Sequence, residues 1–271
     1  MIRKLLTRAV GVLPQATQVQ IRERYWQLKS RILYRSLYSL LNLEHTLDSG
    51  ITVKVESKGE WWIYNDIFVN GEYDVPIQAA LQVSSAKPFV VLDLGANVGY
   101  FAFRVLDRIR RQHLDNILPD ITMIEGSPET FTKLGSRIQS QQLAPATVRT
   151  VHGLVGHRTG SALIRESAVH VKSGIVNIPA GSGVSVAFVD IDTLMHDKAE
   201  IDLLKCDIEG AELMFLENYG DLLRKVRCAV FELHHDQCDT KKCVSILESL
   251  GFRQTILRAN NSFSVCFFSR S

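Results

Sequence analysis

One stretch of the chain limits its possible folds more than any other: an apolar strand that ends in an acid and runs into a glycine turn. Residues 90–94 are apolar apart from Asp93, and the turn Gly95-Ala96-Asn97-Val98-Gly99 leads into a helical pattern from Tyr100 onward. Glycines in such a turn let the backbone bend sharply and approach a ligand closely. The stretch is therefore typical of the ligand-binding turn of a doubly wound α/β fold.

The rest of the chain alternates short apolar runs with helical patterns. We expect strands over residues 89–94, 121–125, 148–154, 201–206, 228–233, 252–257 and 263–268, and helices over 99–112, 128–141, 211–219 and 241–250. This alternation predicts an α/β, Rossmann-like, doubly wound sheet that is mostly parallel. The last two strands follow each other without a helix, which predicts an antiparallel hairpin at the sheet edge. The Gly-rich segment 155–195 predicts an inserted β-hairpin.

The N-terminal part differs in charge from the remainder. Residues 1–43 hold eight Lys and Arg against one acid, a net charge of +7, so that the other residues carry −5. Apolar residues recur there at helical spacing, which predicts a basic amphipathic helical extension over residues 1–50 and a catalytic domain over 51–271. We favour a helix packed on the domain over one that contacts a membrane surface. Residues 51–55 and 61–69 alternate apolar and polar residues and predict a β-hairpin, with a turn at 57–60.

Composition gives no general case for nucleic acid as a partner, because the net charge of the 271 residues is only +2. The five cysteines are odd in number and scattered, which favours a reducing cytoplasm over a disulfide framework. No apolar run approaches the ~20 residues that span a bilayer. The first residues lack the long apolar core and cleavage site of a signal peptide. We therefore expect a cytoplasmic protein, with peripheral membrane contact as an alternative.

A second apolar strand also ends in an acid. Residues 121–124 run into Glu125, followed by Gly126 and Ser127. A carboxylate at this strand end can accept hydrogen bonds from both hydroxyls of a ribose. Glu125 alone is equally compatible with a solvated acid, but its position one strand after the glycine turn favours a ligand contact.

A third apolar strand, residues 201–206, runs into a cluster of charges. Lys205, Asp207, Glu209 and Glu212 fall within eight residues. Burying four charges without a task is costly, which favours a functional site at this strand end. Glu212 has a second interpretation, since an acid in the first turn of a helix stabilises the helix dipole.

These motifs together resemble the FkbM family of S-adenosylmethionine-dependent methyltransferases. The resemblance rests on residues 93–100, on Glu125, on Val189-Asp190-Ile191-Asp192-Thr193-Leu194, on residues 204–212 and on Phe231-Glu232-Leu233-His234. It implies a class I methyltransferase fold, S-adenosylmethionine as cofactor, and methylation of a hydroxyl on a sugar, polyketide or similar acceptor. The cofactor-binding residues that it implies are Asp93, Gly95, Ala96, Asn97, Gly99, Tyr100, Glu125 and Ser127, with Glu72 and Asp74 from a preceding acidic segment.

Methyl transfer to an alcohol needs alignment of the reactants and benefits from a base. Asp207, Glu209 and His234 are the candidate bases, and Lys205 is expected to hold the acidic cluster or to lower the pKa of a hydroxyl. We expect no metal. A divalent cation, if one were used, would find oxygen ligands in Asp207, Glu209 and Glu232. A zinc site from His234, Cys238 and Cys243 is disfavoured, because their spacing matches no standard zinc pattern.

Two other classes of function compete with a methyltransferase. A non-catalytic interaction module could keep the fold, but the intact charged and glycine positions argue against lost activity. A nicotinamide-dependent oxidoreductase is disfavoured by Asn97, which stands where the dinucleotide fingerprint has its second glycine. The partner expected is a small-molecule or glycan acceptor, and neither its identity nor the oligomeric state is indicated by the sequence.

Overall fold

The computed structural model describes residues 37–38, 40–41, 43–83, 88–164 and 183–270 of the chain. A mixed sheet of seven strands lies at its centre, in the spatial order β10-β11-β9-β8-β3-β4-β5. In chain order these strands are β3 (Pro88–Leu94), β4 (Leu118–Glu125), β5 (Thr147–His152), β8 (Ile201–Cys206), β9 (Val226–His234), β10 (Arg253–Ala259) and β11 (Phe263–Ser269). The main helices are α4 (Asp74–Val83), α5 (Tyr100–Arg111), α6 (Pro128–Gln139), α7 (Ile191–Leu194), α8 (Glu212–Asn218), α9 (Gly220–Arg224) and α10 (Thr240–Ser249).

The sheet is parallel except at one edge. Strand β3 runs parallel to β4 and β8, and β5 and β9 extend the parallel part outward. Strand β11 is antiparallel to both β9 and β10. The carboxyl ends of β3, β4, β8 and β9 therefore meet at one edge, where doubly wound folds bind their ligands. The predicted Rossmann-like sheet with an antiparallel edge hairpin is confirmed.

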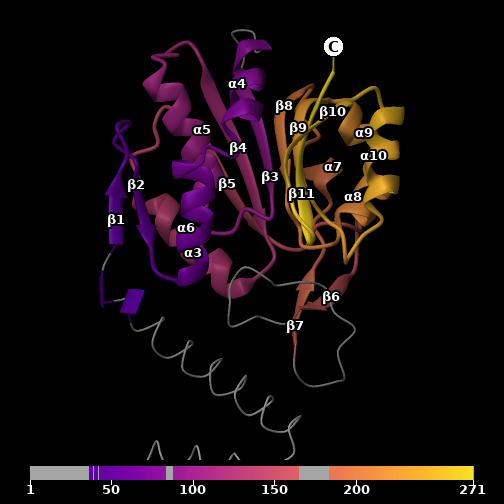
Figure 1. Ribbon diagram of the computed structural model, residues 1–271, viewed down its shortest axis with the longest axis horizontal. Helices are drawn as coiled ribbons and strands as arrows, with labels where there is room; N and C mark the ends of the chain where they lie inside the picture. Colours follow the sequence, from indigo (N-terminus) through magenta and orange to yellow (C-terminus); the bar gives the residue numbers. More distant parts are fainter. Residues whose placement is uncertain (1–36, 39, 42, 84–87, 165–182, 271) are drawn as a thin grey trace, which may run out of the picture.

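Alternate side chains of β3 enter two apolar layers. Phe89 and Val91 pack with residues of α4 and α5 on one face, whereas Val90, Leu92 and Leu94 pack with residues of α8, α9 and α10 on the other. Figure 1 shows these two groups of helices on opposite sides of the sheet. Because β3 is buried on both faces, its sequence is a continuous apolar run rather than an alternating one.

The hairpin predicted within residues 155–195 is present. Strands β6 (Ser161–Ile164) and β7 (Val184–Ala187) pair antiparallel, with Ser161 opposite Ala187. Ile164 and Val186 pack on Leu154, which lies just beyond β5. The two strands thus project beyond the carboxyl edge of the sheet (Figure 1), while the residues that connect them, 165–182, lie outside the described part.

The strand predicted for residues 61–69 is wrong, because the segment is helical. It forms α3 (Lys58–Tyr64) and a π-helical turn, η1 (Asn65–Val69). Ser57 Oγ accepts from the backbone N–H of Glu60 at 3.1 Å, and Glu60 Oε2 accepts from that of Glu56 at 2.7 Å. Residues 57–60, predicted as a turn, therefore start a helix, with Ser57 as its N-cap.

Aromatic residues of α3 and η1 reinforce this helical geometry. The rings of Trp61 and Tyr64 stack with centroids 5.8 Å apart, and those of Tyr64 and Phe68 lie 5.3 Å apart. Residues three and four apart are neighbours on a helix surface. Trp61, Tyr64 and Phe68 have this spacing, and their contacts favour a helix over the strand that alternating apolar and polar residues had predicted.

A hairpin does form upstream, with a different partner strand. Strand β1 (Leu43–Thr46) pairs antiparallel with β2 (Thr52–Val55), so the expected domain boundary at residue 50 falls in the turn between paired strands. Of the helical extension predicted over residues 1–50, residues 1–36, 39 and 42 lie outside the described residues, positions 37–38 and 40–41 are helical, and residues 43–46 form β1. None of the described helices is both long and apolar enough to cross a membrane.

Candidate active site

The glycine turn after β3 is held by backbone packing. Gly95 has φ = +73°, and a Cβ there would lie 1.7 Å from the carbonyl oxygen of Asp207. The N–H groups of Gly95 and Ala96 both donate to the carbonyl oxygen of Ile124, at 3.0 and 2.9 Å. The turn is thus wedged between the ends of β4 and β8, and no residue with a side chain fits at position 95.

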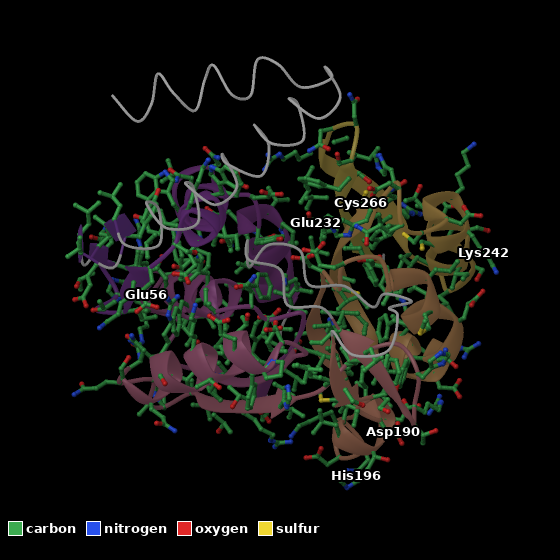
Figure 2. The ribbon with its side chains drawn as sticks, turned by 90° about the horizontal axis from the view of Figure 1, so that it is seen from below. Glu56, Asp190, His196, Glu232, Lys242 and Cys266 are labelled. Carbon is green, nitrogen blue, oxygen red and sulfur yellow. The ribbon has the colours of Figure 1, made fainter. Side chains whose placement is uncertain are left out.

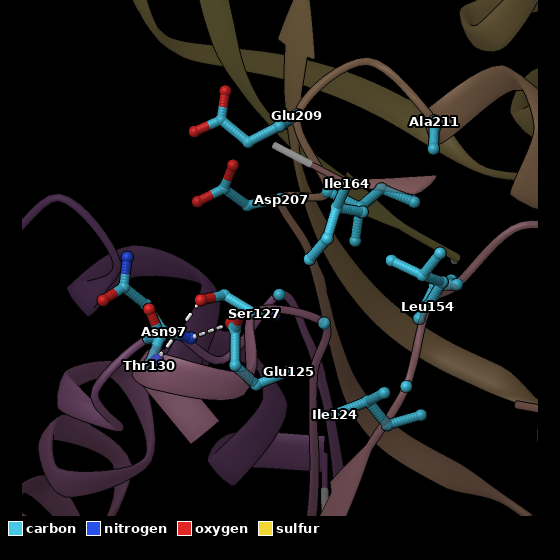
Figure 3. A pocket seen from close by; sticks show the side chains of 15 residues that line it. Asn97, Ile124, Glu125, Ser127, Thr130, Leu154, Ile164, Asp207, Glu209 and Ala211 are labelled. Atoms are coloured by element: carbon cyan, nitrogen blue, oxygen red, sulfur yellow. Dashed lines mark hydrogen bonds between the residues drawn. The ribbon is translucent and has the colours of Figure 1, made fainter. Parts of the chain in front are cut away.

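Glu125, at the end of β4, is bound to two backbone amides. It accepts from the N–H of Asn97 at 2.9 Å and from that of Ser127 at 2.8 Å. Ser127 Oγ in turn accepts from the N–H of Thr130 at 3.2 Å and caps α6 (Figure 3). Burial raises the pKa of Glu125, and the two amides oppose that shift. Each carboxylate oxygen can accept a further hydrogen bond, so Glu125 can also receive ligand hydroxyls.

Asp93 and Lys205 form a buried ion pair beneath the turn. Lys205 Nζ donates to the carbonyl oxygen of Gly95 at 2.7 Å and lies 3.4 Å from Asp93 Oδ1 and 3.6 Å from Asp207 Oδ2. Burial alone would lower the pKa of Lys205, but the nearby carboxylates outweigh it and raise that pKa. Burial also raises the pKa of Asp93, which is fully buried. Lys205 therefore stays charged and holds the turn and the acidic cluster together.

His234 lies among carboxylates at the end of β9. Its Nδ1 lies 3.1 Å from Oε1 of the fully buried Glu212, and its Nε2 lies 3.5 Å from Glu209 and 3.6 Å from Glu232. A carboxylate only accepts, so Nδ1 carries the proton of this hydrogen bond. Burial would lower the pKa of His234, but Glu212, Asp207 and Glu209 outweigh it and raise the pKa to about 9. Burial raises the pKa of Glu232, and Asp207 raises it further.

Two cavities open at this edge of the sheet. The smaller, of about 80 Å³, lies over Glu125 and has an apolar wall that includes Leu154 and Ile164 (Figure 3). The larger, of about 630 Å³, lies between the α3–η1 segment and the edge hairpin. Three residues line both cavities: Asn97, Asp207 and Glu209. Of these, Asn97 (φ = +50°) and Glu209 (φ = +52°) adopt a left-handed backbone, a costly conformation that concentrates at functional sites.

The predicted site residues do not all reach the cavities. Gly95, Asn97, Glu125 and Ser127 line the smaller one, and Glu72, Ala96, Asn97, Tyr100 and Lys205 line the larger one. Asp93, Gly99 and His234 line neither cavity: Asp93 supports the turn from below, Gly99 starts α5 with φ = +88°, and His234 contacts the acids around the cavities. The hydroxyl of Tyr100 donates to the carbonyl oxygen of Lys54, so its polar group is used within the protein.

Asp74 requires a correction. Both of its carboxylate oxygens accept from Arg104 at 2.7 Å, in a bidentate ion pair between α4 and α5. Its side chain lines neither cavity. Its geometry fits a structural contact between two helices rather than the predicted cofactor contact.

Several lining residues of the larger cavity were not predicted from the sequence. Trp61 and Trp62 come from α3, and Arg258 and Phe263 come from the edge hairpin. Ser57, the N-cap of α3, was the signal that could have placed the two tryptophans on a helix. Figure 2 shows Glu232 between the elements of the N-terminal half and the strands of the C-terminal half, where these segments converge.

The sequence model of the methyltransferase FkbM domain family matches residues 93–254, which is more than half of the chain. The chain belongs to this family. It is therefore an S-adenosylmethionine-dependent methyltransferase, which excludes the interaction module and the oxidoreductase as alternatives. The hexuronic acid methyltransferase AglP of Haloferax volcanii is 23% identical over 208 residues, which cover 76% of this chain and 79% of that protein.

Solved structures with related topology have low similarity. The methyltransferase FkbM from Methylobacillus flagellatus is 14% identical, with a TM-score of 0.44, and the match covers 76% of this chain and 60% of that one. Magnesium protoporphyrin IX methyltransferase from Synechocystis, solved with bound S-adenosylmethionine, is 12% identical with a TM-score of 0.43, over 78% of this chain and 84% of that one.

The residues of this FkbM methyltransferase fit S-adenosylmethionine, which carries an ammonium, a sulfonium and a ribose. Glu125 can accept ribose hydroxyls, and the apolar wall of the smaller cavity suits a planar base. The Oδ1 atom of Asn97 is buried and lacks a hydrogen-bond partner among the described residues, so it is available to a ligand donor. Asp207 and Glu209 add negative charge where a cationic cofactor would lie.

Proposed function

We propose that this enzyme methylates a hydroxyl oxygen of a sugar or glycan that binds in the larger cavity. The observation that carries the proposal is the meeting of the two cavities at Asn97, Asp207 and Glu209. A cofactor held over Glu125 and an acceptor in the larger cavity would face each other across these three residues. In-line transfer requires this kind of alignment.

The lining of the larger cavity supports a sugar. Trp61 is 40% exposed and Trp62 is 50% exposed, and both line the cavity together with Phe263. Asn65 and Asp66 add hydrogen-bonding groups on the same side. Flat aromatic faces and a few polar groups suit a ring with both apolar C–H faces and hydroxyls. The hexuronic acid methyltransferase among the relatives supports a sugar as the class of acceptor, although its name gives an acidic sugar rather than a neutral one.

The charges in the larger cavity favour a hydroxyl over a carboxylate as acceptor. Five acidic residues line it against two basic ones, Lys205 and Arg258. Lys205 is paired with Asp93, and Arg258 lies 3.0 Å from both Asp66 and Glu72. An anionic acceptor would find both cations already neutralised, and the remaining carboxylates would repel it.

Glu209 is the group best suited to take the acceptor proton. When bound, S-adenosylmethionine supplies a methyl carbon whose C–S bond breaks as the new C–O bond forms, so that the sulfonium becomes a neutral thioether. His234, with a pKa of about 9, already carries its second proton at neutral pH and cannot accept another. Asp207 and Glu209 both line the two cavities, and each lies near a cation, Lys205 at 3.6 Å and His234 at 3.5 Å. We favour Glu209 because it alone of the two adopts a left-handed backbone, a conformation that concentrates at functional sites.

We further propose that the enzyme acts in a reducing cytoplasm, with weak contact between its basic N-terminal segment and anionic membranes as the alternative to packing of that segment on the domain. All five cysteines are free, and four of them are buried. The charge of +7 over residues 1–43 supports the membrane contact, since basic segments near anionic lipid are attracted to it. We expect no contact with nucleic acid.

Calorimetry and acceptor screening test the proposal. We expect S-adenosylmethionine and S-adenosylhomocysteine to bind and NAD not to bind. Labelled cofactor should then be incubated with neutral glycosides, uronic acids and an extract of the source organism, and the products analysed by mass spectrometry. Methyl ethers on neutral sugars are expected. Methyl esters on uronic acids, or methylation confined to acceptors without sugar, would contradict the proposal.

A further inference from the structure

Three potential metal ligands converge where β8 and β9 end. One carboxylate oxygen of Asp207, one of Glu232 and one ring nitrogen of His234 all lie within 4.8 Å of one another. Asp207 follows β8, whereas Glu232 and His234 are two residues apart on β9 and so point to the same face of the sheet. Adjacent parallel strands thus bring the three side chains together.

His234 is held in the orientation of a metal ligand. Its Nδ1 donates to Glu212 Oε1 at 3.1 Å, so its Nε2 faces Glu232 and Glu209. The side chain is 8% exposed, and Nε2 lies 3.5 Å from Glu209 and 3.6 Å from Glu232. An ion bound to Nε2 would replace the proton that this atom carries in the metal-free protein. Metal-binding histidines almost always donate their other ring N–H to a carboxylate, which fixes the tautomer and the ring.

The carboxylates around His234 outnumber the cations that the described residues place beside them. Lys205 lies on the side of Asp93 and the glycine turn, and donates to the carbonyl oxygen of Gly95. Arg258 is held by Asp66 and Glu72. Lys205 also lies 3.6 Å from Asp207 Oδ2, so one lysine is shared by Asp93 and Asp207, and Glu232 has no Lys or Arg partner among the described residues.

The geometry points to a binding site for one divalent transition-metal ion, of the Mn²⁺ to Zn²⁺ class, formed by Asp207, Glu232 and His234. One imidazole and two carboxylates suit such ions better than Mg²⁺ or Ca²⁺, which prefer oxygen ligands alone. Donors about 2.1 Å from one ion lie at most about 4.2 Å apart, so a small closure of the three side chains completes the site. Three protein ligands leave further positions open toward the larger cavity.

The role of the ion rests on the proposed function, although its binding does not. An ion bound there would take the acceptor hydroxyl at an open position and favour loss of its proton. The O–H bond breaks, the proton passes to Glu209, and the oxygen remains on the metal until it bonds to the methyl carbon. The metal keeps its charge throughout, so no oxidant or reductant is needed.

Metal binding is tested on the full-length protein without cofactor or acceptor. After chelator treatment, the protein is titrated with Mn²⁺, followed by calorimetry and electron paramagnetic resonance, and with Zn²⁺ and Mg²⁺ in parallel. We expect one Mn²⁺ per chain and tighter binding of Mn²⁺ and Zn²⁺ than of Mg²⁺. His234→Ala and Glu232→Gln should weaken binding at least tenfold, and Glu212→Gln should weaken it about 10–100-fold as the outer partner of the histidine.

Matched variants separate a real site from general acidity. His235→Ala removes the neighbouring histidine, which contacts Ser264 on the edge hairpin, and should leave Mn²⁺ binding unchanged. Glu209→Gln should also retain binding within about threefold, because Glu209 is not a ligand. Circular dichroism verifies that each variant is folded, and Asp207→Asn provides a second ligand variant should His234→Ala fail to fold.

The possible failures are distinguishable. Absence of stoichiometric Mn²⁺ or Zn²⁺ binding, or equal affinity in wild type, Glu232→Gln and Asp207→Asn, overturns the metal site. Full-rate methylation of a sugar in excess chelator overturns the role of the metal and leaves the proposed function standing. Specific metal binding without methylation of any sugar supports the site and overturns the proposed acceptor.

Discussion

The two cavities of this enzyme are built in different ways. The smaller one draws most of its polar lining from turns that follow β3, β4 and β8, and backbone hydrogen bonds fix them. The larger one is closed by side chains from α3, η1, β9 and the edge hairpin, segments separated by up to two hundred residues. The first is a property of local motifs, whereas the second depends on tertiary packing. Mutations should therefore affect cofactor and acceptor separately, except where both cavities share a support.

The largest expected effect comes from the buried Lys205–Asp93 ion pair, which supports both cavities. Lys205→Met leaves Asp93 fully buried without its cation, and removal of one partner of a buried pair typically costs about 3–5 kcal/mol. We expect a loss of this size in the free energy of unfolding, measured by urea denaturation. Lys242→Met, which removes an exposed ion pair with Glu217, should cost under about 1 kcal/mol.

A double variant isolates the pair itself. Lys205→Met combined with Asp93→Asn removes the unpaired charge and should recover part of the stability lost in Lys205→Met alone. A loss below about 1 kcal/mol for Lys205→Met would show that the two cavities do not share this support.

The next effect tests the junction of the cavities. Glu209→Gln removes the proposed proton acceptor and should lower the single-turnover rate about 10²–10⁴-fold at saturating cofactor, with cofactor affinity nearly unchanged. Glu217→Gln, on the exposed side of α8 and paired with Lys242, is the matched control and should retain the wild-type rate. Comparison with Asp207→Asn and His234→Ala ranks the candidates, and a Glu209→Gln rate within a few-fold of wild type would remove Glu209 as the base.

Cofactor affinity alone should respond to Glu125. Glu125→Ala removes hydrogen bonds from a charged acceptor and should weaken S-adenosylmethionine binding by about 1.5–3 kcal/mol in calorimetry. Glu129→Ala changes an acid on the neighbouring helix α6, paired with Lys133, and should leave affinity unchanged. An unchanged affinity in folded Glu125→Ala would mean that the smaller cavity does not hold the ribose.

The difference between the cavities also explains what the sequence could predict. The buried strands, the glycine turn and Glu125 were predictable, because a local run of residues encodes each of them and parallel strands bring their ends together. The helix over residues 58–64 was missed because Ser57, interpreted as a turn residue, is the N-cap of that helix. A short aromatic segment fits the periodicity of a helix as well as that of a strand. Only the N-cap residue distinguishes the helix from the strand here.

Side-chain partners were the least predictable feature. Asp74 stands in an acidic segment beside Glu72, yet Arg104, thirty residues later, takes up both of its oxygens. Lys205 was placed in the site from its position beside Asp207, but its bond to the Gly95 carbonyl depends on the exact approach of two turns. Such contacts follow from packing between elements, which spacing along one chain does not specify.

Replacement of a tryptophan in the larger cavity should change acceptor binding alone. Trp62→Ala removes an aromatic face from the larger cavity and should raise the KM for the acceptor about 3–10-fold, the equivalent of one aromatic contact. The kcat and the cofactor affinity should stay within twofold. Val69→Ala, in the exposed end of η1 and outside the cavity lining, serves as control. Equal KM values for both variants would indicate that the acceptor does not rest on α3.

The smallest effect on either cavity is expected from removing residues 1–36. The described lining of the smaller cavity comes from residues 95–211, so we expect cofactor affinity to change by less than about twofold in calorimetry. Binding to anionic liposomes should fall sharply and, in the intact protein, should weaken with added salt, because basic residues near anionic lipid contribute about 1 kcal/mol each. A variant with Lys241→Ala and Arg253→Ala loses exposed basic residues elsewhere and should bind liposomes as the intact protein does. If the intact protein ignores anionic liposomes even at low salt, the membrane contact is excluded. If the truncation instead weakens cofactor binding, the N-terminal segment helps to support both cavities, as the Lys205–Asp93 pair does.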